Sequence, residues 1–198
     1  WDAGKPMPAR VIRVQAKLGH TVYDTHRAAL DVRPRPLVLV HGMLADAATW
    51  SEYRGFAERA HPGWEAFAVG DGRAPGTMRT GDWFALTQRP YTIASNARIL
   101  AEYVRGVRDQ EDAEYVDLVA HSMGGLISRQ YIQDHMPASP DPERSIVRHL
   151  VQIGTPNMGS PCADTITTPQ TAAFGQEFYR WIVYDDPNWK IEQFDLDR

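Results

Sequence analysis

The feature that most constrains the fold is a regular alternation of short apolar runs with amphipathic stretches from residue 37 onward. Apolar runs predict buried strands at Leu37–Val40, Trp64–Val69, Tyr115–Ala120 and His149–Ile153. Amphipathic spacing predicts helices at Thr49–Ala60, Thr92–Arg108 and Met123–His135, the last stopped by Pro137. Because strands that alternate with helices are joined by crossovers, we predict an α/β fold with a mostly parallel sheet and helices on both faces.

A different pattern precedes this alternation. Residues 9–18 alternate apolar and polar side chains, and after the Gly19-His20 break the chain continues with Thr21-Val22-Tyr23. This pattern predicts an antiparallel hairpin, which we expect to add strands at one edge of the parallel sheet. The prolines of residues 33–36 predict an extended linker. We therefore divide a single domain of residues 1–198 into an N-terminal hairpin and linker, residues 1–36, followed by the alternating region.

Composition excludes several classes of protein. The chain has 198 residues, a net charge of −4 and 43% apolar residues, which suits one domain with a real core. No apolar run is long enough for a transmembrane helix, and no Lys/Arg run favours nucleic acid as a partner. The single Cys162 excludes an internal disulfide framework and is interpreted as a small buried hydrophobe. The residues Asp24, His61, Asp71 and Asp82 have no metal-ligand spacing, so we predict neither a metal nor a cofactor.

The segment Ala120-His121-Ser122-Met123-Gly124-Gly125 carries the main chemical signal. It follows a predicted strand and opens a predicted helix, which is the context that a nucleophile elbow requires. Ser122 is the predicted nucleophile, and small residues at Ala120 and Gly124 would let the strand and helix backbones approach. The alternative interpretation is a serine that merely caps a helix after a strand.

Acyl transfer also needs hydrogen-bond donors for the developing oxyanion. The backbone N–H of Met123, the residue after the nucleophile, is one predicted donor. The second should come from the loop His41-Gly42-Met43, which follows the strand at residues 37–40. We assign it to the Met43 N–H, with the Leu44 N–H as the second choice. His41 is interpreted as a structural histidine that holds this loop, in preference to a catalytic base.

Three ordered segments carry a family resemblance: Leu-Val-His41-Gly-Met, Ala-His-Ser122-Met-Gly-Gly-Leu-Ile-Ser-Arg-Gln-Tyr and Ile-Gly154-Thr-Pro-Asn-Met-Gly-Ser160. They resemble the bacterial lipase/esterase branch of the α/β-hydrolase superfamily, and in particular small bacterial triacylglycerol lipases, whose elbow also begins with Ala. The resemblance implies a Ser-His-acid triad that hydrolyses carboxylic esters of acyl or lipid substrates. It also implies a pocket wall at Thr155 and Asn157, and a secreted or periplasmic location.

The sequence departs from this family after the nucleophile. Of the histidines, only His135 and His149 follow Ser122, and both are predicted to lie far from it. Asn157 stands where an acid is expected, and the later aspartates follow no recognisable strand. We therefore expect the triad acid, the triad histidine and the two final strands to be missing from residues 1–198. A further C-terminal segment or a second chain would supply them, and residues 1–198 alone would show little turnover and tend to associate.

Two further alternatives remain open at this point. The aromatic-rich residues 160–198 are interpreted either as a lid or cap segment over an acyl pocket or as an ordinary helix packed on the sheet. Besides a serine esterase or lipase, the chain could be a catalytically inert or partial hydrolase-fold binding module. It could also be a thioesterase or acyltransferase on the same fold.

Overall fold

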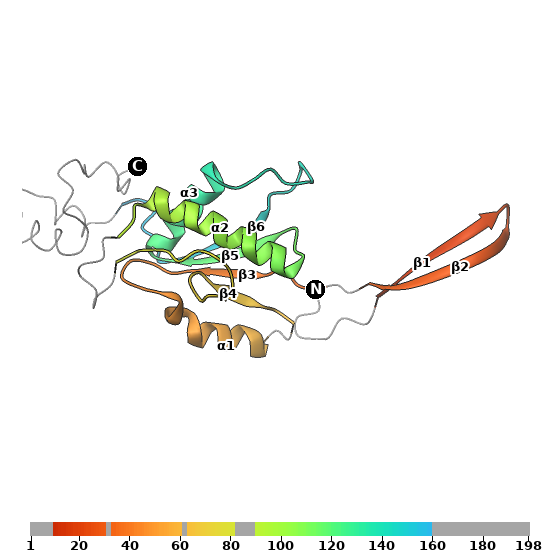
Figure 1. Cartoon of the computed structure of the whole chain (residues 1–198), viewed down its shortest axis with the longest axis horizontal. Coiled ribbons are helices and arrows are strands. Elements are labelled where there is room, and N and C mark those ends of the chain that lie inside the picture. The colour runs from red at the N-terminus through yellow and green to blue at the C-terminus, as the bar shows by residue number, and fades with distance from the viewer. Residues whose placement is uncertain (1–9, 31–32, 61–62, 82–89, 160–198) are drawn as a thin grey trace, which may run out of the picture.

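The computed structural model describes residues 10–30, 33–60, 63–81 and 90–159 (Figure 1). Its strands are β1 (Arg10–Leu18), β2 (Thr21–Leu30), β3 (Leu37–Val40), β4 (Ala66–Ala68), β5 (Val116–His121) and β6 (Val147–Ile153). Its helices are the 3-10 turn η1 (Ala47–Trp50), α1 (Ser51–Ala60), α2 (Ile93–Glu111) and α3 (Met123–Asp134). The predicted alternation of strands and helices is confirmed, with ends that shift by a few residues.

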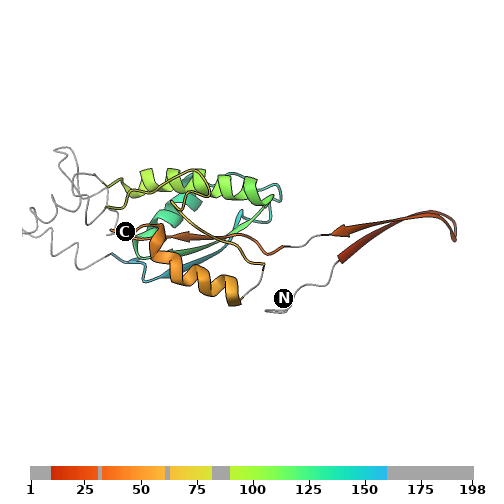
Figure 2. The ribbon, with the colours of Figure 1, turned by 60° about the horizontal axis from the view of Figure 1, so that its bottom comes forward.

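Strands β3 to β6 form one parallel sheet in the order β4-β3-β5-β6. Helix α1 covers one face of this sheet, and α2 and α3 cover the other (Figures 1 and 2). Alternate side chains of β3 point to opposite faces of the sheet. Val38 and Val40 pack in the apolar cluster with α2 and α3, whereas Leu39 packs with Trp50 on the other face. The predicted mostly parallel sheet with helices on both faces is therefore confirmed.

The N-terminal hairpin is present, but its predicted position is wrong. β1 and β2 pair antiparallel in a separate two-stranded sheet, and in both views they project away from the parallel sheet (Figures 1 and 2). Side chains such as Val14 and Leu18 are accordingly 62% and 72% exposed. β1 and β2 pair with each other, and the linker between β2 and β3 contains Pro34 and Pro36, which have no amide donor with which to continue strand pairing.

Among the described residues, α2 is the longest helix, and it packs on the parallel sheet. The Oγ1 of Thr92 accepts a hydrogen bond from the Ser95 N–H at 3.1 Å, which caps the first turn. Asp112 adopts a left-handed conformation with φ of 48° and ends the helix. The inward face of α2 is buried against the sheet, so the helix provides a rigid support for the loops that precede it.

A buried carboxylate fastens the loop after β4 to α2. Asp71 accepts hydrogen bonds from the Ala68 N–H at 3.2 Å and the Arg73 N–H at 3.0 Å, and its Oδ2 pairs with Arg54 at 3.3 Å. The hydroxyl of Tyr103, fully buried on α2, lies 2.6 Å from the other carboxylate oxygen, Oδ1. Burial and this carboxylate both raise the pKa of Tyr103, so the phenol keeps its proton and acts as a donor.

Replacing Tyr103 with Phe should lower the free energy of unfolding by about 1.5–3 kcal/mol, because it removes a buried hydrogen bond to a charged group. Denaturant unfolding measures the change. The matched control is Tyr115→Phe, which removes an exposed hydroxyl 3.1 Å from Glu114 and should change stability by less than about 0.5 kcal/mol. Equal effects of the two substitutions would contradict the structural role of Asp71 and Tyr103.

Candidate active site

The turn at Ser122 has the geometry of a nucleophile elbow. β5 ends at His121, α3 begins at Met123, and Ser122 between them has φ of 52° and ψ of −130°. Few non-glycine residues adopt a positive φ, and this one is a strained conformation that a tertiary constraint must hold. The Ser122 side chain makes no capping hydrogen bond to α3, so the interpretation of Ser122 as a simple helix cap does not describe this turn.

Neighbouring strands hold the turn on both sides. The Ser122 N–H donates to the carbonyl of Ile153 at the end of β6 at 2.8 Å, and the Gly125 N–H donates to the Ser122 carbonyl at 3.0 Å. A Cβ atom on Gly124 would lie 2.6 Å from the carbonyl oxygens of both Val40 and His41. Only glycine fits there, and its absence of a side chain lets the start of α3 contact the end of β3.

The loop after β3 approaches the serine directly. A Cβ atom on Gly42 would lie 2.8 Å from Ser122 Cβ and 3.4 Å from Ser122 Oγ. The structure thus brings His41-Gly42 and Ser122 together, as the sequence predicted. Parallel strands in the order β3-β5 followed by this elbow are the arrangement of the α/β-hydrolase fold.

The two loop amides considered as oxyanion donors differ in their partners. The Leu44 N–H donates to the Thr80 carbonyl at 3.0 Å, and Leu44 itself has φ of 55°. Among the described residues, no acceptor is found for the Met43 N–H, and the Met43 residue is 46% exposed. Met123 is the first residue of α3, so its N–H has no acceptor within the helix. Of the three amides assigned or considered as oxyanion donors, those of Met43 and Met123 thus have no backbone acceptor among the described residues, whereas that of Leu44 has one.

His41 is buried beneath this loop. Its Nδ1 lies 3.2 Å from the Gly42 carbonyl oxygen and 3.4 Å from Thr80 Oγ1, and the residue is 2% exposed. Desolvation lowers the pKa of His41, although the Gly42 carbonyl and the Asp46 carboxylate oppose that shift. The imidazole is thus neutral near pH 7 and bonded to the loop, in keeping with the structural role predicted for it.

The remaining predicted site residues flank the elbow. His121 is exposed at the end of β5, and the hydroxyl of Thr155 lies where any side chain on Gly125 would collide with it. Asn157 donates to Gln152 Oε1 at 3.2 Å and accepts from Arg129 on α3 at 3.0 Å. The Asn157 side chain therefore fastens the loop after β6 to α3.

The two later histidines lie away from Ser122. His135 follows the last turn of α3. His149 pairs with Asp117 at 2.9 Å near the start of β5, and Arg35 pairs with the same carboxylate at 3.0 Å. Ser122 lies five positions after Asp117 along the strand, or about 16 Å at the rise of a β-strand. His149 is accordingly at the opposite end of the sheet.

Several sequence predictions fall outside the described residues, namely those on His61, Asp82, Cys162 and residues 160–198. Across the described ranges, no three His, Cys, Asp or Glu side chains gather in a way that could hold a metal ion. Within the same ranges, each helix is too short or too polar to cross a membrane.

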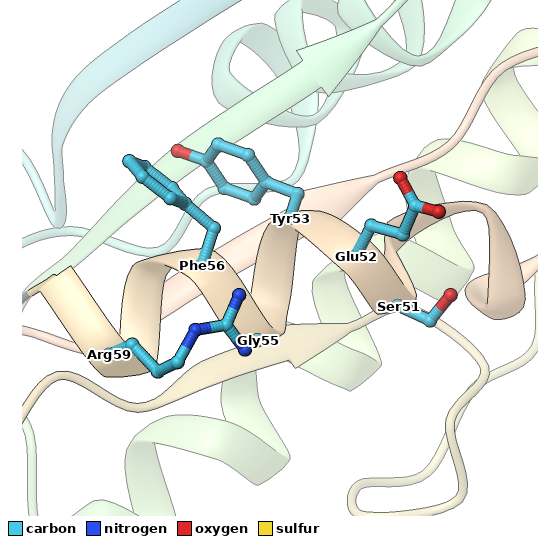
Figure 3. A pocket seen from close by; sticks show the side chains of 6 residues that line it. All are labelled: Ser51, Glu52, Tyr53, Gly55, Phe56 and Arg59. Atoms are coloured by element: carbon cyan, nitrogen blue, oxygen red, sulfur yellow. The ribbon is translucent and has the colours of Figure 1, made fainter.

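An open hollow on α1 is separate from the elbow. Its lining comes from that helix alone, Ser51, Glu52, Tyr53, Gly55, Phe56 and Arg59 (Figure 3). The rings of Tyr53 and Phe56 have centroids 6.5 Å apart, and Phe56 is 60% exposed. No predicted site residue contributes to this hollow, so it has no part in the chemistry considered below.

Sequence reasoning missed two buried polar residues beside the loop, Thr80 and Asn96. Thr80 contacts the loop after β3, and the Asn96 side chain bonds the backbone of Arg79 and Tyr91. Thr80 lies in a Gly/Pro-rich loop where no periodic pattern marks it. Asn96 could have been found, because a polar amide on the inward face of an amphipathic helix needs buried partners.

The lowered pKa of His41 predicts how stability depends on pH. Between the folded pKa and the ordinary value of about 6.5, the unfolded chain binds more protons, so stability falls as the pH drops through that interval. Replacing His41 with Gln removes this titration. The difference in unfolding free energy between wild type and His41→Gln should therefore shrink as the pH falls from about 8 to about 5. Urea unfolding at several pH values tests this, and parallel stability curves would contradict it.

Comparison with known proteins places the chain in a family. Solved structures similar to it include the mature Bacillus licheniformis lipase BlEst2 (20% identity, TM-score 0.49, 89% of this chain and 62% of that one). A highly thermostable carboxyl esterase from Bacillus coagulans is also similar (15% identity, TM-score 0.47, 87% of this chain and 55% of that one). So is the RedJ thioesterase of Streptomyces coelicolor (24% identity, TM-score 0.45, 75% of this chain and 49% of that one). The chain thus spans 49% to 62% of the lengths of these three proteins. A family model matches residues 13–175, and the chain therefore belongs to the family described as a domain of unknown function, DUF7379.

Proposed function

We propose that this protein is a serine hydrolase that cleaves carboxylic esters, an esterase or lipase, through an acyl-enzyme on Ser122. One observation carries the proposal: Ser122 lies on a strained strand-to-helix turn and makes no capping hydrogen bond. In this position it lies against Gly42 of the loop after β3. A serine hydroxyl so held is exposed to a bound carbonyl group. Holding it in this conformation has a cost in stability that helix capping does not require.

The proposed reaction uses main-chain groups to stabilise charge. Attack of Ser122 Oγ on the ester carbonyl carbon gives a tetrahedral intermediate whose oxygen carries the negative charge. The Met43 and Met123 N–H groups, which lack acceptors in the described structure, would donate to that oxygen. The general base takes the Ser122 proton and returns it to the leaving oxygen as the intermediate collapses, so that the alcohol departs and the acyl group stays on Ser122. Attack of water on this acyl-enzyme then releases the acid and restores the serine.

The proposal also requires a general base, because a serine hydroxyl is a weak nucleophile at neutral pH. His135 and His149 lie away from Ser122, and His41 Nδ1 is bonded to its own loop. We propose that the base and its acid come from outside the described residues, either in a further segment or in a second chain. Lipid esters as substrates and a secreted or periplasmic location rest on the sequence resemblance alone.

Ser122→Ala in the full-length protein should lower kcat for p-nitrophenyl ester hydrolysis by about 10⁴-fold or more, because triad residues act as a unit. Circular dichroism and thermal unfolding should show an intact fold. Ser145→Ala, which changes an exposed serine, should leave kcat within about 3-fold of wild type.

Covalent labelling provides a second test of the same residue. A fluorophosphonate probe should label the wild-type protein and should not label Ser122→Ala. Failure to label wild type would favour the inert binding module, and product analysis with thioester and alcohol acceptors separates the other acyl enzymes.

Met43 provides a test of the oxyanion assignment. Met43→Ala should have a mild effect because the N–H remains, whereas Met43→Pro should lower kcat by about 10²-fold or more because the donor is removed. Both variants should unfold at temperatures near that of wild type. Equal losses in two folded variants would show that the Met43 side chain matters and that the assigned donor is wrong.

A further inference from the structure

We infer that Thr80 is a positioning residue for the oxyanion hole: it fixes the loop after β3 so that the Met43 N–H faces the carbonyl oxygen of the substrate. The inference rests on the proposed function and extends it to a residue outside the sequence motifs. Thr80 is 2% exposed and belongs to the loop between β4 and α2, yet its contacts lie on the segment from His41 to Ala45.

Thr80 contacts the loop on both sides of Met43. Its carbonyl accepts the Leu44 N–H at 3.0 Å, and its hydroxyl donates to the Ala45 carbonyl at 3.1 Å. The same hydroxyl oxygen lies 3.4 Å from His41 Nδ1. Met43 is thus the residue between two anchored positions, with its own N–H left available.

The proton positions in this cluster are mutually consistent. The Thr80 hydroxyl has one proton, and the Ala45 carbonyl can only accept it. The hydroxyl oxygen is then an acceptor toward His41, as is the Gly42 carbonyl 3.2 Å from the same ring nitrogen. Both contacts require a proton on His41 Nδ1. The hydroxyl of Thr80 therefore orders the imidazole as well as the loop.

Thr80 is itself anchored to α2 through its neighbour Arg79. The Asn96 side chain accepts from the Arg79 N–H at 2.8 Å and donates to the carbonyls of Arg79 at 3.1 Å and Tyr91 at 3.0 Å. Asn96 is fully buried on α2, so its amide has one orientation that satisfies all these groups. The loop after β3 is thereby held, through Thr80 and Arg79, by a packed helix. A preorganised site requires support of this kind.

Strain in the loop makes this support necessary. Leu44 has φ of 55°, a left-handed conformation that costs a leucine free energy and persists only where neighbours impose it. Without the Thr80 hydroxyl, Ala45 and His41 each lose a buried partner, and the loop can relax. Because an oxyanion donor acts only when it is correctly placed, relaxation would weaken binding of the transition state more than binding of the ester.

The test compares Thr80→Val, which removes the hydroxyl at nearly constant shape, with Thr80→Ser, which keeps it. In the full-length protein, Thr80→Val should lower kcat for p-nitrophenyl butyrate about 10- to 100-fold with KM within about 3-fold. Its affinity for an aryl boronic acid, a mimic of the tetrahedral intermediate, should fall in parallel. Thr80→Ser should stay within about 3-fold of wild type in all three quantities, as should Thr77→Val, an exposed matched control in the same loop.

The outcomes separate this inference from the proposed function. Lack of fluorophosphonate labelling in wild type would refute the function, and with it this role of Thr80. If wild type labels but folded Thr80→Val keeps wild-type kcat and boronate affinity, only the positioning role is overturned. If Thr80→Val does not fold, Thr80→Ala is measured in its place, with the same expected pattern. A rise in KM with unchanged kcat, or no rescue by Ser, would also overturn the inference.

Discussion

The close approach of two backbone segments at the carboxyl ends of β3 and β5 is the constraint on which the rest of the site depends. Gly124 lies against the carbonyls of Val40 and His41, and Gly42 lies against Ser122, at distances that exclude a Cβ atom. The first contact seats the start of α3 on β3, and the second brings the following loop up to the serine. Together they bring a hydroxyl and two main-chain amides into one small region before any ligand arrives.

This contact is accompanied by backbone strain on both of its sides. Ser122 and Leu44 have φ of 52° and 55°, and hydrogen bonds to the carbonyls of Ile153 and Thr80 hold them there. Each such residue costs about 1–3 kcal/mol, which the surrounding packing must offset. Leu44 lies two residues after Gly42, whose backbone approaches Ser122, so both strained residues belong to the segments that meet at this contact. Such strain is typical of functional sites, which is why we propose that the chemistry takes place here.

Local sequence patterns were sufficient to predict the fold and the turn at Ser122, because apolar periodicity and a motif at fixed spacing can be recognised within a few residues. The same alternation predicted that β1 and β2 pair, yet it could not predict where the hairpin lies, since alternation indicates local strand pairing and not the position of a hairpin relative to another sheet. Leu44 could be set aside as a donor only through its bond to Thr80, 36 positions later. Such pairings between loops have no periodic signal, so Thr80 was invisible from the sequence.

The two ends of the parallel sheet handle charge differently, and this difference fits the proposed chemistry. At the amino ends, Arg35 and Asp117 form an ion pair, and the His149 ring lies 2.9 Å from the same carboxylate. At the carboxyl ends, burial lowers the pKa of His41 and keeps its ring neutral, while positive potential comes from main-chain amides and the N-terminus of α3. Fixed dipoles of this kind do not titrate and need no reorganisation when charge develops. The edge at Ser122 is therefore suited to the negative charge that the proposed reaction would develop in its tetrahedral intermediate and lose when the carbonyl group re-forms.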